Sequence, residues 1–405
     1  REMRGVSSTL PAASPSFGLA ALLTTLVALG PLSTDLYLPS LPTLATVFAT
    51  DAARVQLTLS VFLIGFAVAQ LAYGALSDRF GRRPLMLSGL ILYFFASVGC
   101  LFAQSIEMLI AARFLQAVGA CAGPVLGRAI VRDVWGPVEA VRVLAYVSGA
   151  MALAPLVGPT LGGFLTVFFG WQSNFALLAL FSILQVLAVW RWLGESNAHL
   201  DPTATQFGRM LKNYGILLVD RNYVGYLLSL SFSYSALFAF ISGSAFILIG
   251  RYGLSPQVFG MCFGLVVAGY ISGSALSGRL VRQQGGDRLL LIGGWIGAAA
   301  GMVMWGLDLA GIHHLAAILA PMYFATLAVG LVMSNAVGRA LAPYPKMAGA
   351  ASALMGFCQM GIAAVVGILV GHGVDSGGTV LPMTVALCGM LVPLSFLALV
   401  RPGKT

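Results

Sequence analysis

Residues 55–83 read VQLTLSVFLIGFAVAQLAYGALSDRFGRR, and this stretch contains the pattern on which the fold of the whole chain depends. A long, mostly apolar run is followed at once by a short loop with one aspartate and several arginines. About 20 apolar residues are enough for a helix to cross the hydrocarbon core of a bilayer, and short loops rich in Lys and Arg stay on the cytoplasmic side. The stretch therefore predicts a helix that crosses a membrane and ends in the cytoplasm.

The rest of the 405-residue chain repeats this pattern. Hydrophobic residues make up 59% and charged residues 9%, with a mean hydropathy of +0.93. Soluble domains hold about 25% charged residues, so the composition excludes a soluble enzyme and a disordered chain. The apolar runs do not alternate as the strands of a membrane barrel do. We predict an all-α polytopic membrane protein whose twelve spans lie near 17–47, 53–77, 85–104, 107–131, 139–168, 172–194, 222–250, 256–281, 288–309, 313–341, 347–371 and 379–400.

The distribution of basic residues predicts the orientation. With the N-terminus placed in the cytoplasm, 19 of the 22 Lys and Arg residues fall in cytoplasmic segments, and the outer segments hold only Arg54 and Arg251. This bias is the signal that orients membrane proteins, so we expect both termini in the cytoplasm. The net charge of +9 then reflects contact with anionic lipid headgroups, and we expect membrane lipids but no nucleic acid as partners.

The chain divides into two similar halves. Ala75-Leu76-Ser77-Asp78-Arg79 follows the second predicted helix, and Ala275-Leu276-Ser277-Gly278-Arg279 follows the eighth, 200 residues later. Repeats of this kind are typical of transporters whose binding site lies between the halves near the membrane midplane. We predict two pseudo-symmetric six-helix bundles. The expected segments are 1–16 (cytoplasmic), 17–194 (first bundle), 195–221 (cytoplasmic linker with a short amphipathic helix near 203–215), 222–400 (second bundle) and 401–405 (cytoplasmic tail).

Asp35 is the one acidic residue of the 13 that lies deep in a predicted helix, 18 residues after its start. A carboxylate at such a depth costs about 2.5–3.5 kcal/mol and usually faces a water-filled cavity. The alternative is a structural acid satisfied by Ser33, Thr34 or a neighbouring helix. Because burial penalises the charged form of a carboxyl group, we expect Asp35 to bind and release a proton near neutral pH. Competition between a proton and a substrate for this group would suffice for antiport.

Arg113 is the only basic residue placed deep in a predicted helix. Gln116 and Gly119 lie on the same helical face, and Arg113 lies about 9 Å from the outer end of its helix at 1.5 Å per residue. We therefore expect Arg113 and Asp35 to share one cavity. The alternative is an arginine that extends outward to the lipid headgroups.

Proline and glycine interrupt two of the helices. Pro31, Pro39 and Pro42 bracket Asp35, and each interior proline removes a backbone hydrogen bond and bends a helix. The fifth predicted helix holds a second group, which consists of Pro155, Gly158, Pro159, Gly162 and Gly163. A glycine pair spaced like Gly158 and Gly162 lets another helix approach closely. For the prolines the alternative is that they have no special role, because membrane helices commonly tolerate proline.

The loop after the second predicted helix is a candidate cytoplasmic gate. One interpretation is simply positive charge on the inner side. The other is a latch in which Asp78 accepts hydrogen bonds from a helix N-terminus in the other half, while Arg82 pairs with Asp133. The gate residues are Gly74, Asp78, Arg79, Gly81, Arg82, Arg83 and Asp133.

These motifs resemble those of a known family. Gly74 to Arg83 is similar to the loop motif of the major facilitator superfamily. Arg113 to Gly119 resembles the fourth-helix motif of that family, with Ala117 in place of its usual glycine, and Gly158 to Gly163 resembles its fifth-helix antiporter motif. Asp35-Leu36-Tyr37-Leu38-Pro39, Ser334-Asn335-Ala336 and the run from Met347 to Ser352 resemble the twelve-helix drug/proton antiporters, and among them the bicyclomycin/chloramphenicol-resistance exporters.

The resemblance implies an exporter of the bacterial inner membrane whose halves rock to expose one site alternately to each side. It implies that protons are exchanged for small amphipathic drugs similar to bicyclomycin or chloramphenicol. In this interpretation Asp35 takes up the proton, Arg113 is its cavity partner, and Asp78, Arg82 and Asp133 form the gate. Some relatives have a second acid about two turns before the helix-1 aspartate, where this chain has Val27-Ala28-Leu29. This departure implies fewer protons per cycle. Gly278 stands where the corresponding loop of the first half has Asp78, and this implies a weaker latch in the second half.

A cavity that accepts many drugs needs apolar walls with few polar groups. Tyr234 and Phe238 lie one turn apart on one helical face, although simple packing is the alternative for each of these side chains. The predicted substrate cavity comprises Asp35, Tyr37, Leu59, Arg113, Gln116, Met151, Tyr234, Phe238, Asn335 and Gln359.

Other classes of protein fit less well. The four histidines lie near predicted loops and there is no P-loop motif, so we expect no enzyme, no metal, no cofactor and no ATP-driven pump. We expect a monomer. An exporter of a physiological metabolite, amino acid or siderophore remains an alternative. A proton-coupled importer is disfavoured by the fifth-helix motif, and a channel would leave Asp35 without a role.

Overall fold

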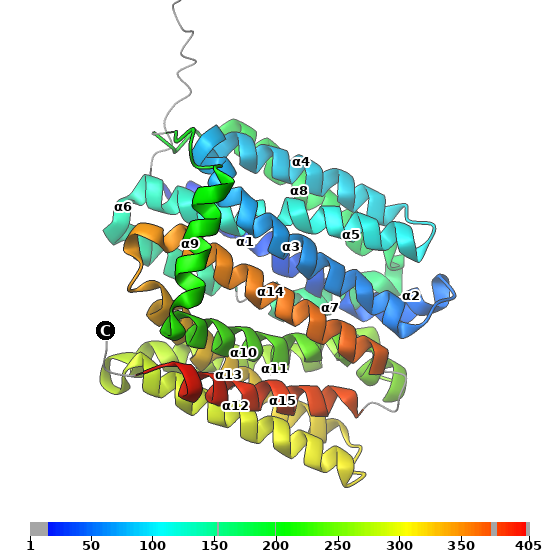
Figure 1. The fold of residues 1–405 in the computed structure, drawn as a ribbon. Coiled ribbons are helices and arrows are strands. Elements are labelled where there is room, and N and C mark those ends of the chain that lie inside the picture. Colours follow the sequence, from blue (N-terminus) through cyan, green and yellow to red (C-terminus); the bar gives the residue numbers. More distant parts are fainter. Residues whose placement is uncertain (1–14, 152–153, 199, 374–378, 402–405) are drawn as a thin grey trace, which may run out of the picture.

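The computed structural model describes residues 15–151, 154–198, 200–373 and 379–401 of the chain. In these ranges the secondary structure is helical, without strands, and the long helices run side by side through one bundle (Figure 1). The predicted all-α fold is therefore confirmed.

The first half contains seven of the longer helices and two short elements. Their bounds are α1 (Phe17–Asp35), η1 (Leu38–Ser40), α2 (Leu41–Val47), α3 (Ala52–Phe80), α4 (Arg82–Leu101), α5 (Ile106–Ala120), α6 (Ala122–Met151), α7 (Ala154–Phe169) and α8 (Gln172–Trp192).

The second half follows the short helix α9. The bounds are α9 (Phe207–Val219), α10 (Arg221–Ala245), the π-helical turn η2 (Phe246–Arg251), α11 (Pro256–Gln284), α12 (Gly286–Leu309), α13 (Leu315–Leu341), η3 (Pro345–Met347), α14 (Ala348–Gly373) and α15 (Val380–Leu399).

Within the described residues, eleven helical stretches are long and apolar enough to cross a membrane. The remaining predicted span, the fifth (139–168), corresponds to the last part of α6 and to α7, an apolar helix of 16 residues. The fourth and fifth spans meet inside α6 at Gly136, which has a φ of 70°. Glycine adopts such a conformation without steric cost, so the chain turns there from one span to the next.

The first predicted span is not one continuous helix. Its first part, α1, ends at Asp35, and a short 3₁₀ turn, η1, leads into α2. Pro39 and Pro42 lie at the first positions of η1 and α2, where the missing N–H of proline is tolerated. The prolines therefore end α1 and restart the helix, and this places Asp35 at the point where the helix breaks.

The two ends of the bundle differ. One end carries the start of α1, the α3–α4 loop, helix α9 and the end of α15, and we call it the α9 end (Figure 1). The helix predicted near 203–215 is present there as α9, four residues later than expected. Leu217 of α9 is buried whereas Leu211, Leu218 and Val219 are exposed, which fits a helix that lies at a membrane surface.

The halves contact each other mainly through two helix pairs, α3 with α14 and α7 with α11. At the end opposite α9, Gln56 of α3 packs on Gly371 of α14, and Gly260 of α11 packs on the backbone of Thr160 in α7. A Cβ atom at Gly260 would lie only 2.4 Å from the Cα atom of Thr160. The apolar core continues across both halves, so this end of the bundle is sealed.

Candidate transport site and gate

Asp35 lies at the seam between the two halves. Its side chain is buried, and its Oδ1 accepts a hydrogen bond from Thr34 Oγ1 at 3.1 Å. On one side it packs against Gly158 of α7, where an added Cβ would lie 3.1 Å from the Cβ of Asp35. On the other side the turn η1, which follows the helix break at Asp35, contacts α10 and α11 of the second half. The seam between the halves therefore runs past Asp35.

Arg113 is the other buried charge, and among the described residues only these two charged side chains are buried. Its Nη1 donates to the backbone carbonyl of Ser33 at 2.9 Å and to Gln116 Oε1 at 2.5 Å. Gln116 in turn donates to Ser97 Oγ at 2.8 Å. The predicted partnership of Arg113 and Gln116 on one helical face is therefore present.

Three aromatic rings enclose the Arg113 guanidinium. Its carbon lies 4.3 Å from the ring centre of Phe62, 4.5 Å from that of Tyr37 and 6.0 Å from that of Phe175. A desolvated cation over such rings gains up to about 2 kcal/mol per contact. No carboxylate of the described residues forms an ion pair with Arg113. Arg113 and Asp35 therefore form no ion pair in this structure, because the rings and the Ser33 carbonyl hold the guanidinium, and a cavity shared by the two stays a prediction.

Several predicted cavity residues are packed rather than exposed to an open cavity. Tyr37, Leu59, Gln116 and Phe238 are fully buried, and the hydroxyl of Tyr37 is hydrogen-bonded to Thr58. In this structure they face no open space, because the halves pack together at this level, and their part in a substrate cavity stays a prediction. Tyr234 is half-buried and stacks on Phe238, with 6.4 Å between ring centres.

The remaining predicted cavity residues lie elsewhere. Asn335 donates to Ser277 Oγ at 2.8 Å and to the carbonyl of Leu331 at 2.7 Å, so it joins helices within the second half. A buried amide needs such partners, and α11 supplies one, while the place of Asn335 in a substrate cavity stays a prediction. Gln359 is nearly buried on α14. Met151 is the last residue of α6, and its side chain is outside the described part of the structure.

The glycines of the fifth-helix motif allow α7 to approach two partners. A Cβ at Gly162 would lie 1.6 Å from the carbonyl oxygen of Leu36, and one at Gly163 would lie 2.4 Å from that of Pro256 in α11. Pro155 lies in the first turn of α7, and Pro159 lies in its interior. The predicted close approach is confirmed, and it brings α7 directly against the break in the first helix at Asp35.

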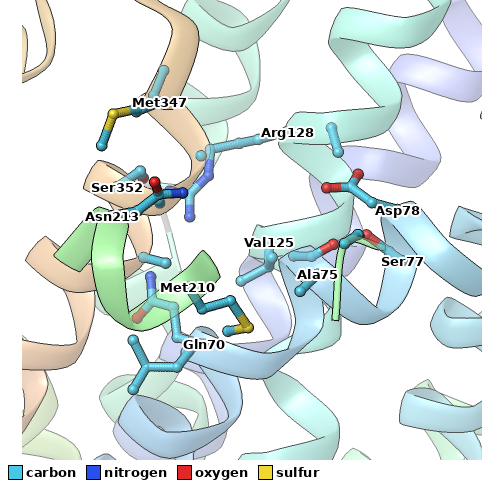
Figure 2. Close-up of a pocket in the computed structure, with 18 of the residues that line it drawn as sticks. Gln70, Ala75, Ser77, Asp78, Val125, Arg128, Met210, Asn213, Met347 and Ser352 are labelled. Atoms are coloured by element: carbon cyan, nitrogen blue, oxygen red, sulfur yellow. The ribbon is translucent and has the colours of Figure 1, made fainter. Parts of the chain in front are cut away.

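A cavity of about 440 Å³ opens between the halves at the α9 end (Figure 2). Residues of α3, α6, α9 and α14 line it, and Figure 2 shows Arg128 and Asn213 projecting into it. None of the predicted substrate residues lines this cavity. Sequence reasoning missed Gln70, Arg128, Arg132 and Asn213, because basic residues near a cytoplasmic end are most simply explained by the positive-inside bias.

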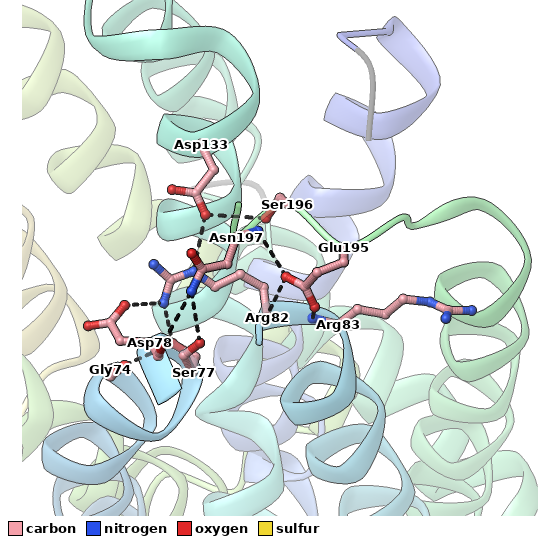
Figure 3. Close-up of polar contacts among 9 residues, drawn as sticks. All are labelled: Gly74, Ser77, Asp78, Arg82, Arg83, Asp133, Glu195, Ser196 and Asn197. Carbon is pink, nitrogen blue, oxygen red and sulfur yellow. Dashed lines mark hydrogen bonds and ion pairs between the residues drawn. The ribbon is translucent and has the colours of Figure 1, made fainter. Parts of the chain in front are cut away.

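Arg82 is the centre of the predicted gate (Figure 3). Its Nε donates to Asp133 Oδ2 at 3.1 Å, and its Nη1 donates to Asp78 Oδ1 at 2.6 Å and to Ser77 Oγ at 2.5 Å. The predicted pair of Arg82 and Asp133 is therefore present. Asp78 bonds to Arg82 and not to a helix N-terminus of the other half, so the latch contact of Asp78 stays a prediction for a conformation in which this cavity is closed. The start of α14 lies on the opposite wall of the cavity.

The segment predicted as a linker folds back on this loop. Glu195 accepts from the backbone N–H groups of Arg82 at 3.0 Å and of Arg83 at 3.1 Å, and so caps the N-terminus of α4. Gly81, with a φ of 99°, leaves room for the carboxylate, since a Cβ there would lie 2.6 Å from Glu195 Oε2. Acids are favoured at helix N-termini, but the 113 residues between Glu195 and Arg82 hid this contact from sequence reasoning.

The other gate residues form contacts that do not involve Arg82. Arg79 Nη1 donates to Thr205 Oγ1 at 2.6 Å, and Arg83 Nη2 donates to the carbonyl of Trp190 at 2.8 Å. Figure 3 shows Arg83 pointing away from Arg82. Gly74 accepts from Ser77 through its carbonyl at 2.9 Å. These contacts fasten the loop to its own half and to the linker that follows it.

The second half carries an ion pair at the corresponding place with the charges exchanged. Asp287 at the start of α12 accepts two hydrogen bonds of 2.8 Å from Arg339 near the end of α13, and a third from Tyr226 at 2.7 Å. In the first half the arginine, Arg82, begins α4, which is the third membrane span, and the aspartate, Asp133, lies in α6 near the end of the fourth span. The repeat thus preserves an ion pair although the acid of the first loop is replaced by Gly278.

Two bundles of membrane-spanning helices, a buried carboxylate at their seam and a cavity at one end define a membrane transporter. The chain belongs to the Major Facilitator Superfamily, because the sequence model of that family matches residues 22–368. This is a family of transporters rather than of enzymes.

Relatives cover most of the chain. It is 35% identical over 89% of its length to the uncharacterized MFS-type transporter YdgK of Bacillus subtilis, of which 90% is covered. It is 30% identical over 84% to a bicyclomycin resistance protein homolog of Haemophilus influenzae (86% covered). It is 31% identical over 82% to a chloramphenicol resistance protein of Pseudomonas aeruginosa (78% covered).

Solved structures share the fold. The crystal structure of a D-xylose-proton symporter matches 96% of this chain and 98% of its own, with a TM-score of 0.74 at 16% identity. A bacterial homolog of the human lysosomal transporter Spinster matches 95% of this chain and 98% of its own, with a TM-score of 0.69 at 16% identity. At such low identity these matches establish the fold alone.

Proposed function

We propose that this chain exports small amphipathic drugs across the bacterial cytoplasmic membrane in exchange for protons. The observation that carries the proposal is Asp35, a buried carboxylate at the seam of the halves that forms no ion pair with any cation in the described part of the chain. The relatives named for bicyclomycin and chloramphenicol resistance support drugs of that kind as substrates.

The exchange follows from the cost of a buried charge. A carboxylate removed from water without a cationic partner is unfavourable, so it is satisfied by a proton or by a hydrogen-bonding or cationic group of a substrate. One carboxyl group does not hold both at once. If the halves expose it alternately to each side, a substrate that displaces the proton on the inner side is carried out, and a proton returns.

In this proposal the α9 end faces the cytoplasm. Arg79, Arg82, Arg83 and Arg128 lie there, in accord with the positive-inside bias. The cavity at that end is then open to the cytoplasm, while the packing of α3 on α14 and of α7 on α11 seals the outer side. This conformation would take up drug from the cell.

Closure of the cytoplasmic side completes the cycle. Asp78 and the start of α14 face each other across the cavity. Movement of the halves would bring the carboxylate toward the positive end of the α14 dipole, which favours an anion. We propose that Asp78 then changes partner, while Arg82 stays bound to Asp133 as the fixed part of the gate.

The test is proton release from the purified, unbuffered protein when chloramphenicol is added, followed with a pH-sensitive dye. We expect release from the wild type and none from Asp35→Asn, while Asp51→Asn, an exposed helix cap at the opposite end, releases protons normally. Release from Asp35→Asn equal to wild type would refute the assignment. Absence of release from every protein with the drug, but release with cell-derived metabolites, would favour the alternative of a metabolite exporter.

A further inference from the structure

Two arginines in the cavity at the α9 end have no anionic partner. Arg128 and Arg132 lie one turn apart on α6, and both line the cavity with exposed side chains. Within the described chain neither makes a hydrogen bond or an ion pair. Arg82, in the same wall, is held by two carboxylates. Like charges one turn apart repel each other, so Arg128 and Arg132 create a local positive potential without a direct anionic partner among the described residues.

The opposite wall adds to this potential. The first residues of α14, from Ala348 to Ala350, line the cavity. The N-terminus of a helix carries a partial positive charge, and a Cβ at Gly349 would meet no atom within 4 Å, so its backbone is open to the cavity. Asn213 of α9 also projects into the space (Figure 2) and can donate from its amide.

The acids of the cavity are engaged elsewhere. Asp78 is bound to Arg82 at 2.6 Å. Asp201 accepts from the backbone N–H of Thr203 at 2.8 Å and from its hydroxyl at 2.6 Å. Neither carboxylate forms an ion pair with Arg128 or Arg132. The side chains of Leu71, Val125, Met210 and Met347 supply apolar lining next to the arginines.

We propose that Arg128 and Arg132 bind the anionic group, a carboxylate or a phosphate, of an amphipathic molecule whose apolar part rests on this lining. Arginine recognises both groups through paired N–H donors. Gly127 packs on Val27 of α1, so Arg128 lies about 12 Å along the helix axis from Asp35, at 1.5 Å per residue. The site is thus separate from the exchange at Asp35 and stands whether or not protons are exchanged there.

Equilibrium binding of 1-naphthoate to the intact protein, in nanodiscs of zwitterionic lipid, tests the proposal. The matched probe is 1-naphthamide, which has the same rings without the charge. We expect the double variant Arg128→Gln/Arg132→Gln to weaken naphthoate binding roughly tenfold or more, with little change for naphthamide, and added salt to weaken only naphthoate binding. Arg279→Gln/Arg282→Gln, two exposed arginines at the same end but outside the cavity, should bind like the wild type.

Equal naphthoate affinity in the wild type and in the Arg128/Arg132 variant would overturn the proposal. If the double variant unfolds, Arg128→Lys/Arg132→Lys replaces it, because this variant keeps the charge. A partial loss of naphthoate affinity in this variant supports the site. Unchanged naphthoate affinity contradicts recognition through the paired N–H donors of arginine. Anionic phosphatidylglycerol in the nanodisc distinguishes the two sources of the anion. If phosphatidylglycerol competes with naphthoate in the wild type but not in the double variant, the site also binds lipid headgroups. If it does not compete, the site binds anions from the aqueous phase.

Discussion

Arg113 donates a 2.9 Å hydrogen bond to the backbone carbonyl of Ser33. The buried carboxylate of Asp35 lies only two residues further along α1, yet the guanidinium does not pair with it. The arginine therefore anchors the end of α1 through its backbone, and it leaves the acid uncompensated and ready to bind a proton or a substrate.

Replacement of Arg113 by Met tests this division of roles. The change removes a buried cation without an ionic partner, so the lost hydrogen bonds and ring contacts are offset by the desolvation cost that disappears. We expect a thermal unfolding temperature equal to or above that of the wild type, but transport at background level. Unfolding followed by tryptophan fluorescence and a drug efflux assay measure the two effects. A loss of stability above about 3 kcal/mol would show instead that the guanidinium mainly holds the fold, and exposed Arg282→Met is the control.

The packing of α7 on the broken first helix predicts a graded glycine series. Gly162→Ala places a methyl group 1.6 Å from the Leu36 carbonyl oxygen, and we expect it to cost about 3 kcal/mol or more. Gly158→Ala meets the Cβ of Asp35 at 3.1 Å and should be milder in stability but impaired in transport. Gly306→Ala has no atom within 4 Å and should stabilise its helix by about 0.5–1 kcal/mol. Thermal unfolding ranks the three, and equal stabilities would contradict the packing described.

The cap that Glu195 forms on α4 predicts a stability effect far from the seam. Glu195→Ala leaves three backbone N–H groups, those of Arg82, Arg83 and Asn197, without their acceptor, and we expect a loss of about 1–2 kcal/mol. Glu107→Ala removes an acid from the first turn of α5 that pairs with Arg54 in solvent, and it should cost less than about 1 kcal/mol. Thermal unfolding in detergent compares them. The interpretation fails if the two variants lose the same stability.

The burial of Gln56 allows a prediction of how readily the halves separate at the end of the bundle opposite α9. Both of its amide atoms are buried without a hydrogen bond, against Gly371 of α14. Gln56→Met should stabilise the closed state by about 1–3 kcal/mol, because an unsatisfied polar group disappears. In a variant without native cysteines, Ser60→Cys reports opening through its rate of alkylation, which we expect to fall roughly tenfold. Exposed Gln172→Met should leave this rate unchanged, and an unchanged rate in Gln56→Met would refute the idea.

The sequence alone predicted the class of fold. Apolar runs of sufficient length, the position of basic residues and the echo around Ser77 and Ser277 led to a membrane bundle with two halves. These signals are local, since each depends on the transfer of one segment from water to lipid. For the same reason Asp35, Arg113 and Arg82 stood out, because a charge in an apolar run or a dense short loop is visible without knowledge of contacts.

What the sequence determined by itself is thus which segments cross the membrane and which side chains are costly there. Only the tertiary structure decided their partners: Arg113 lies among rings and beside Ser33 rather than with Asp35, Glu195 caps a helix more than 100 residues away, and Asn335 joins helices within one half. Arg128 and Arg132 are set into a cavity only by the placement of α9 and α14. The physical reason is that the partner of a polar group is selected by distance and geometry between helices, and many arrangements of the same helices satisfy the same hydrophobic pattern.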